Sequence, residues 1–191
     1  MARATKQQSE LTAAAIRGTA LRLFAELGYA DVGLERVAEL SGVTRGAVYH
    51  HFGSKLGLFT AVVDDAQAVV AGAVSGAAPH DGWSAIEAGS VAYMRAVVDP
   101  AVRRILLVDA PAVLGWAAWR SSDAAHARRL LAEGLGALDD LAVDPGAAAA
   151  LLDGAMTEAA LWIATGGDRE MAEEGLLRLI GSLRGDRTVA G

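Results

Sequence analysis

The chain has 191 residues, of which 53% are hydrophobic and none is cysteine, and its formal net charge is −6. A chain of this length can bury a substantial core, while the lack of cysteine excludes disulfide frameworks and thiolate metal sites. Alanine, a strong helix former, dominates the hydrophobic residues, and runs of β-branched residues are few, so we expect an all-α protein.

The charge is divided unevenly along the chain. Residues 1–60 carry seven Lys or Arg and five Asp or Glu, a net +2, whereas residues 61–191 carry ten and eighteen, a net −8. Affinity for phosphate depends on the local field, so a mildly basic N-terminal part can bind a polyanion while an acidic body stays away from it. The first ten residues, MARATKQQSE, lack an apolar stretch, and we expect a cytoplasmic protein with no membrane contact.

The first predicted helix covers residues 11–27. Ile16, Ala20, Leu23 and Leu27 recur at helical spacing and give the helix one apolar face. Gly28 follows directly and can take the left-handed conformation that ends a helix.

The next segment, Leu34 to Phe52, predicts two short helices joined by a tight turn. Gly42 can adopt the left-handed conformation at the end of the first helix, and the Thr44 hydroxyl can cap the second. Val48 and Phe52 then face inward on that second helix. This pattern is typical of a helix-turn-helix that reads DNA, in which the second helix is the recognition helix.

The residues left on the outer face of the recognition helix fit DNA chemistry. Such a helix enters the major groove with its N-terminus first, so Arg45 is placed to reach a guanine edge and Gly46 to let the backbone come close. Tyr49, His51 and Lys55 follow at positions suited to phosphate contacts. Taken singly, each of these residues fits a packing role or a solvated surface group better, whereas the joint pattern favours DNA binding. The complete predicted contact set is Thr44, Arg45, Gly46, Tyr49, His50, His51, Lys55 and Arg36.

Residues 16–59 resemble the DNA-binding domain of TetR-type (TetR/AcrR) transcriptional regulators. The resemblance is carried by LFAELGY at 23–29, TRGAVYHHF at 44–52 and SKLGLF at 54–59. It implies that the pair Gly28-Tyr29 ends the first helix. It also implies that Tyr49, His51, Ser54 and Lys55 lie at the exit of the recognition helix.

The chain departs from the family pattern at Val32 and Gly33. The family usually has Thr or Ser there, which caps the second helix and touches a phosphate. Gly33 offers no side-chain acceptor, so we expect one phosphate contact to be missing, with Arg36 as a possible substitute.

Further helices are marked by caps and breakers. We expect a long helix from Ser54 to about residue 76, a helix over 83–98 capped by Asp81, and further helical segments over 100–138. Asp109 with Pro111 marks a start within this last region. Asp144-Pro145 opens a long helix that Gly166-Gly167 ends, and Asp168 opens the final helix over 168–184.

The middle helices carry the residues of a possible sensor. Large rings and a thioether lie at Tyr93, Met94, Trp116 and Trp119, with Arg120 and His126 as polar anchors, and they would suit an apolar or aromatic effector. The alternative is ordinary core packing. The segment ILLVDAPAVLGW at 105–116 also resembles C-terminal domains of TetR-type regulators, which bears on architecture and not on the effector.

The last two long helices are expected to form a homodimer, as the resemblance implies. Their faces combine small residues, which allow close helix approach, with branched apolar ones. The alternative is that these faces pack inside one subunit. The predicted interface set is Leu151, Leu152, Ala155, Ala159, Trp162, Leu176, Leu179, Ile180 and Leu183.

Together these observations predict a DNA-binding domain over 1–53, with its motif at about 34–53, and a helical ligand-binding and dimerisation domain over 54–191. We expect a repressor that binds a palindromic operator as a dimer and is released by a small, largely apolar effector. The open alternative is an activator or architectural protein without a ligand. No catalytic, metal or cofactor residues are predicted, because adjacent His50 and His51 point apart on a helix and no nucleophile constellation is present.

Overall fold

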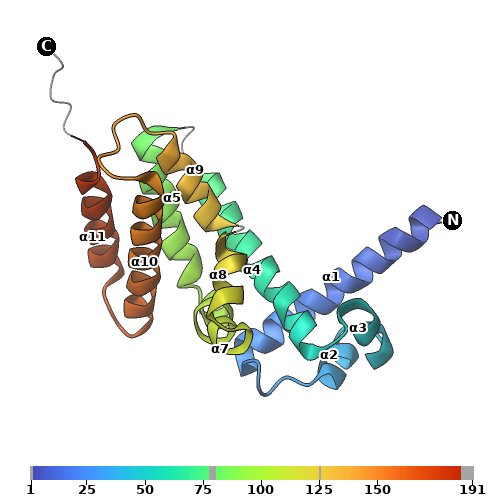
Figure 1. Ribbon diagram of the computed structural model, residues 1–191. Coiled ribbons are helices and arrows are strands. Elements are labelled where there is room, and N and C mark those ends of the chain that lie inside the picture. Colours follow the sequence, from blue (N-terminus) through green and yellow to red (C-terminus); the bar gives the residue numbers. More distant parts are fainter. Residues whose placement is uncertain (1, 78–80, 125, 186–191) are drawn as a thin grey trace, which may run out of the picture. The chain divides into compact units, whose positions relative to one another are not determined.

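The computed structural model describes residues 2–77, 81–124 and 126–185, and this part of the chain consists of helices joined by short connections (Figure 1). The prediction of an all-α fold is confirmed. In chain order the helices are α1 (Ala2–Leu27), α2 (Leu34–Leu40), α3 (Arg45–Phe52), α4 (Lys55–Ala77), α5 (Gly82–Val97), α6 (Pro100–Arg103), the π-helix η1 (Arg104–Asp109), α7 (Ala110–Leu114), α8 (Trp116–Ala124), α9 (Ala127–Gly136), α10 (Pro145–Ala164) and α11 (Arg169–Ser182).

The contacts divide the chain into two compact units. The first unit comprises Met1–Ala66 and Pro100–Trp119, and the second comprises Gln67–Asp99 and Arg120–Gly191. Helix α4 begins in the first unit and continues into the second.

The first unit is built around an aromatic cluster. The ring centroid of Phe59 lies 5.1 Å from that of Phe24 and 4.9 Å from that of Tyr29. Both pairs meet edge to face, the arrangement that aromatic quadrupoles favour. An ion pair at 2.6 Å between Arg17 and Asp65 also joins α1 to α4. The start of α4 is thereby fixed against the end of α1.

The second unit packs α10 against α9 and α5, and α11 against α10 and α5 (Figure 1). Leu135, Leu152 and Ile180 are buried between these helices. The loop before α10 is tied to the end of α11, because the N–H of Ala142 donates to the carbonyl of Leu183 at 2.9 Å.

A buried carboxylate joins three helices of the second unit. Asp153 on α10 is only 1% exposed. Its Oδ2 lies 2.6 Å from Arg120 on α8 and 4.0 Å from Arg128 on α9. Burial of a charge is costly unless it is paired, and two guanidinium groups provide that pairing here.

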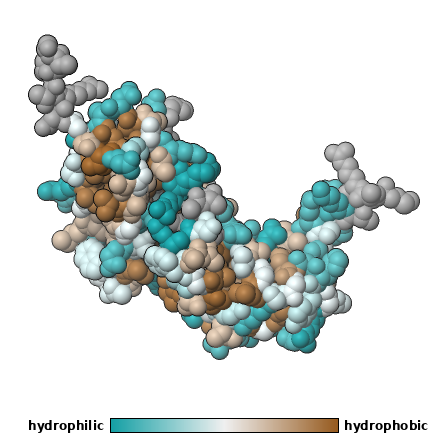
Figure 2. All heavy atoms as spheres, viewed as in Figure 1, coloured by the Kyte–Doolittle hydropathy of each residue, from teal (hydrophilic) through white to brown (hydrophobic). Residues whose placement is uncertain are grey.

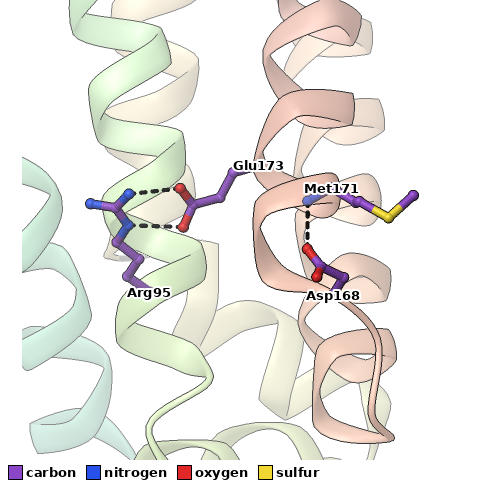
Figure 3. Close-up of polar contacts among 4 residues, drawn as sticks. All are labelled: Arg95, Asp168, Met171 and Glu173. Atoms are coloured by element: carbon purple, nitrogen blue, oxygen red, sulfur yellow. Dashed lines mark hydrogen bonds and ion pairs between the residues drawn. The ribbon is translucent and has the colours of Figure 1, made fainter.

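Three of the predicted helix caps are confirmed. Thr44 Oγ1 accepts from the Ala47 N–H at 3.2 Å, Asp144 from Ala147 at 2.9 Å, and Asp168 from Met171 at 2.9 Å, the last drawn in Figure 3. Asp81 lies at the start of α5, but its side chain makes no capping hydrogen bond to the described backbone.

Two helix boundaries differ from the prediction. Helix α1 begins at Ala2 and not at residue 11, since nothing in the polar N-terminal sequence breaks a helix. Within the predicted helical region 100–138, Gly115 with φ +80° separates α7 from α8, a break that was not predicted from the sequence. Such a left-handed conformation suits glycine and interrupts the helical hydrogen bonds. The π-helix η1 had no signal in the sequence.

Helices α4 and α10 are long and apolar enough to cross a membrane, by length and composition only. In their most apolar windows 39% and 33% of the residues are buried inside the protein. The core helices of soluble proteins have the same length and composition, so these two properties alone do not establish a membrane span.

Candidate nucleic-acid interface

The predicted helix-turn-helix forms as two short helices with a glycine turn. Helix α2 ends where Gly42 takes φ +67°, and the N–H of Val43 donates back to the carbonyl of Ala38 at 3.0 Å. The Thr44 cap then starts α3. Val37 on α2 and Val48 on α3 are fully buried, so the inner faces of the two helices are locked together.

This packing leaves one face of α3 open to solvent. Thr44, Arg45, Gly46, Tyr49 and His50 are exposed. Arg36 on α2 is also exposed, whereas His51 and Lys55 are half-buried. The predicted DNA-contact residues are thus accessible at the surface to differing degrees.

Arg45 is held by two neighbours. Its guanidinium lies 2.7 Å from the carboxylate of Glu35 on α2 and donates to the Tyr49 hydroxyl at 3.2 Å. The hydrogen bond with Tyr49, followed by the charge of Glu35, raises the pKa of Arg45 above its ordinary value. The side chain is therefore fully charged and partly oriented. The contact with Glu35 was not predicted, because this residue lies ten positions earlier on the other helix.

Lys55 makes contacts within the protein. Its ammonium donates to the carbonyl of Ala30 at 3.0 Å and lies 4.5 Å from the ring centroid of Tyr29. A cation over an aromatic face is attracted by the ring quadrupole. Lys55 therefore fixes the loop after α1 and, being half-buried, still has part of its surface in solvent.

Gly46 leaves space in front of the second position of α3. A Cβ at this residue would meet only the Thr44 hydroxyl, at 3.8 Å, among the described atoms. The fold itself therefore does not require a glycine here. A glycine at this position would be needed if a binding partner approached the backbone of α3 closely.

Two side chains of η1 form hydrogen bonds with the backbone at the start of the loop between α1 and α2, within the first unit. Arg104 donates to the carbonyl of Leu27 at 3.1 Å, and Asp109 accepts from the N–H of Tyr29 at 2.9 Å. Between them Gly28 has φ +83°, and a Cβ there would collide with the guanidinium of Arg104. Sequence reasoning found the glycine stop and missed the two side chains that surround it.

A cavity of about 190 Å³ lies within the second unit, between α4, α5, α9 and α10. Of the six predicted effector residues, all of which are described, Tyr93 alone lines it. Met94 is buried beside it in sequence but packs in the core. Helix geometry explains the difference, since consecutive residues point about 100° apart.

The other predicted effector residues have different surroundings. Trp116 is exposed and its ring lies 5.0 Å from that of buried Trp119 in the first unit. Arg120 pairs with Asp153, and His126 is half-buried just before α9. This cavity therefore brings in Tyr93 alone of the six, and a role of the other five in effector binding stays a prediction.

The predicted dimer residues divide into surface and core. Leu151 and Trp162 on α10 are 67% and 46% exposed, and Leu179 on α11 is 41% exposed. Figure 2 shows hydrophobic surface, coloured brown, over α10 and α11. Leu152, Leu176 and Ile180 are buried inside the subunit, so for these three the alternative of internal packing is correct, while Ala155, Ala159 and Leu183 are half-buried.

Two regions of the chain match known protein families. Residues 16–62 match the family described as "Bacterial regulatory proteins, tetR family", and residues 83–184 match "Tetracyclin repressor-like, C-terminal domain". The regulator AcrR of Shigella flexneri is 45% identical over 62 residues, which cover 32% of this chain and 29% of the relative. The repressor AcnR of Corynebacterium glutamicum is 45% identical over 56 residues, 29% of this chain and 30% of the relative.

Solved structures extend the similarity to the whole fold. A TetR-family transcriptional regulator from Pectobacterium atrosepticum is 33% identical, with a TM-score of 0.70 over 93% of this chain and 94% of that one. NalD of Pseudomonas aeruginosa, at 23% identity, shares the fold with a TM-score of 0.63 over 95% and 99%. The two matched regions, and a 33% identical relative covered almost completely, establish that this chain belongs to the TetR family of bacterial transcriptional regulators.

Proposed function

We propose that the protein binds a palindromic DNA operator as a homodimer, represses transcription from it, and is released by a small, largely apolar effector. The observation that carries the proposal is the exposed, oriented Arg45 at the N-terminal end of α3, on a helix-turn-helix whose inner faces are packed. AcnR, a relative over the N-terminal region, is named a repressor, which favours repression over activation.

Within the DNA-binding domain, which we assign to residues 1–53, Arg45 reads a guanine edge in the major groove. Thr44, Tyr49, His50 and His51 contact the backbone or neighbouring bases from the same helix. Arg36 and Lys55 add positive charge near the phosphates. Gly46 allows the backbone of α3 to approach the groove floor.

Dimerisation supplies the second half-site. One recognition helix reads few base pairs, so a useful specificity requires two heads related by a two-fold axis. Leu151, Trp162 and Leu179 provide exposed apolar side chains on α10 and α11 that a second copy would cover. The half-buried residues Ala155 and Ala159 have small side chains, which allow a helix of the second copy to pack closely against α10.

The regulatory domain, residues 54–191, would take up the effector in the cavity between α4, α5, α9 and α10. Helix α4 contributes Val74 to that cavity and Lys55 to the DNA-binding side, so one continuous helix connects the two functions. A ligand that prefers a conformation with wrongly placed heads would release DNA. This cavity favours a ligand-responsive regulator over an architectural protein, and a cytoplasmic location follows from the DNA target.

Selection from a random duplex library followed by fluorescence anisotropy tests the proposal. The wild type should enrich a palindrome and bind it tightly, and Arg45→Ala should lose about 1 to 3 kcal/mol on that duplex, more than it loses on scrambled DNA. Arg129→Ala, which removes an exposed arginine on α9, is the matched control and should bind like the wild type. If Arg45→Ala discriminates as well as the wild type, Arg45 does not read the sequence.

Light scattering tests the assembly. The wild type should be a dimer at micromolar concentration, and Leu151→Asp should give monomers that also lose operator affinity. Met171→Asp adds the same charge at an exposed apolar residue outside the proposed set and serves as the control. A wild-type monomer that binds the palindrome tightly would contradict the proposed dimer.

A further inference from the structure

The cavity in the second unit is a small, mostly apolar chamber. Ile86, Tyr93, Leu131 and Met156 form its buried walls. Among the twelve described residues that line it, none carries a charge. A charged ligand that enters the cavity loses its hydration and finds no opposite charge there. This desolvation cost disfavours the binding of ions.

One wall of the cavity carries a polar group that lacks a partner. Ser90 on α5 is 3% exposed, and its hydroxyl has no hydrogen-bond partner among the described residues. Buried hydroxyls are almost always hydrogen-bonded, because leaving one unsatisfied is costly. A serine hydroxyl can both donate and accept, so it can pair with a hydroxyl or a carbonyl of a ligand.

The size of the cavity restricts the ligand further. At about 190 Å³ it is somewhat larger than the engineered cavities of about 150 Å³ that bind benzene. It is smaller than the pockets of about 300–1,000 Å³ that hold drug-sized molecules. The space therefore fits a single six-membered ring with a short substituent.

Glycines on two walls keep this space open. A Cβ at Gly134 on α9 would lie 2.8 Å from Cδ1 of Ile86, and one at Gly89 on α5 would lie 3.3 Å from Cγ1 of Val74. A side chain at either position would force Ile86 or Val74, which both line the cavity, to shift. The dimensions of the cavity are thus set by close helix approach.

We propose that this cavity binds a neutral monocyclic compound with one hydroxyl or carbonyl group, which pairs with the hydroxyl of Ser90. The assignment rests on the proposed ligand response and specifies its chemistry. Tyr93 and Met156 supply the apolar and polarizable contacts for the ring, and Ser90 supplies its orientation.

Isothermal titration calorimetry of the full-length protein with four probes tests the assignment. We expect 4-ethylphenol to bind, ethylbenzene to bind about five-fold more weakly because it lacks the hydroxyl, and 4-ethylbenzoate and 4-phenylphenol not to bind. In Ser90→Ala the two small neutral probes should bind with equal affinity, so that the discrimination disappears. Ser90→Leu should fill the cavity and bind none of the four.

Two results would overturn the assignment. One is a Ser90→Ala protein that still binds 4-ethylphenol more tightly than ethylbenzene. The other is a wild-type protein that binds 4-ethylbenzoate or 4-phenylphenol with the same affinity as 4-ethylphenol. Ser90→Ala changes little volume and keeps the test valid if Ser90→Leu does not fold.

Operator binding measured on the same samples separates the two proposals. If 4-ethylphenol binds through Ser90 and operator affinity is unchanged, the cavity assignment stands and induction through it fails. If a compound of another class releases the operator while none of the four probes binds, the proposed function stands and the cavity assignment fails.

Discussion

Asp109 accepts a hydrogen bond at 2.9 Å from the backbone N–H of Tyr29, which precedes it by 80 positions in the chain. Tyr29 belongs to the loop after α1, and its ring packs against Phe59 at the start of α4. One carboxylate therefore connects η1 to the residues that support the helix-turn-helix. Arg104, 3.8 Å from the same carboxylate, binds the neighbouring carbonyl of Leu27.

This connection predicts that Asp109→Ala weakens both stability and DNA binding. Without the carboxylate the N–H of Tyr29 has lost its acceptor in a partly buried setting, at a cost of about 1–2 kcal/mol. The melting temperature should fall by about 3–6 °C in calorimetry. Asp109→Asn keeps an acceptor oxygen and should retain most of the stability, and equal melting of Asp109→Ala and the wild type would contradict the role.

A second prediction concerns Gly46, whose missing Cβ leaves open space on α3. Gly46→Ala should stabilise the free protein by about 0.5–1 kcal/mol, because alanine is the better helix former. It should weaken operator binding, because the added methyl group meets the groove. Thermal unfolding and anisotropy on the same variant test the two effects. If operator affinity is unchanged, DNA does not approach this residue.

A third prediction follows from the ion pair at 2.7 Å between Arg45 and Glu35. Both side chains are largely exposed, so the pair adds little to stability, and Glu35→Gln should melt close to the wild type. Removal of this carboxylate takes a negative charge away from the DNA-facing surface and leaves Arg45 less constrained. Affinity for scrambled duplexes should rise about three-fold at low salt, with a smaller preference for the operator.

Glu39→Gln is the matched control for this variant. It removes the same charge from an exposed position on the same helix, but Glu39 is not the carboxylate that pairs with Arg45. If both variants change DNA binding equally, the effect of Glu35 is one of net charge and not of its contact with Arg45.

The pair Arg95 and Glu173 gives a pH-dependent prediction. Arg95 on α5 donates two hydrogen bonds, at 2.9 and 2.6 Å, to the Glu173 carboxylate on α11, as Figure 3 shows. The hydrogen bonds from Arg95 lower the pKa of Glu173 below its ordinary value. A lowered pKa in the folded state stabilises the protein above the unfolded-state pKa of about 4.3, and this contribution is lost as the pH falls through the folded-state pKa.

Glu173→Gln should therefore melt lower than the wild type at pH 7, by no more than about 3 °C because the pair is partly exposed to solvent. The difference should shrink when the pH falls below about 4. Glu174→Gln, which breaks an exposed pair with Arg178 within α11, is the control and should show little effect at either pH. A difference that stays constant down to pH 3 would refute this origin.

Local signals in the sequence determined the helical class, the turn at Gly42 and the caps at Thr44, Asp144 and Asp168. Each cap joins a side chain to a backbone N–H three positions later, so the interaction can be predicted from the sequence alone. The exposed face of α3 was predictable for the same reason, because Val48 and the turn spacing fix which side of the helix packs.

Tertiary structure alone decided which apolar residues serve which purpose. Leu151 and Leu152 are both apolar neighbours on α10, but one is exposed and the other buried, because only contacts with α9 and α5 choose the inner face of a helix that is apolar nearly all round. The carboxylate partners of Arg45 and Tyr29, Glu35 and Asp109, lie on other elements, 10 and 80 positions away. Such pairs form only when packing brings distant segments together, and no spacing rule in a single sequence predicts them.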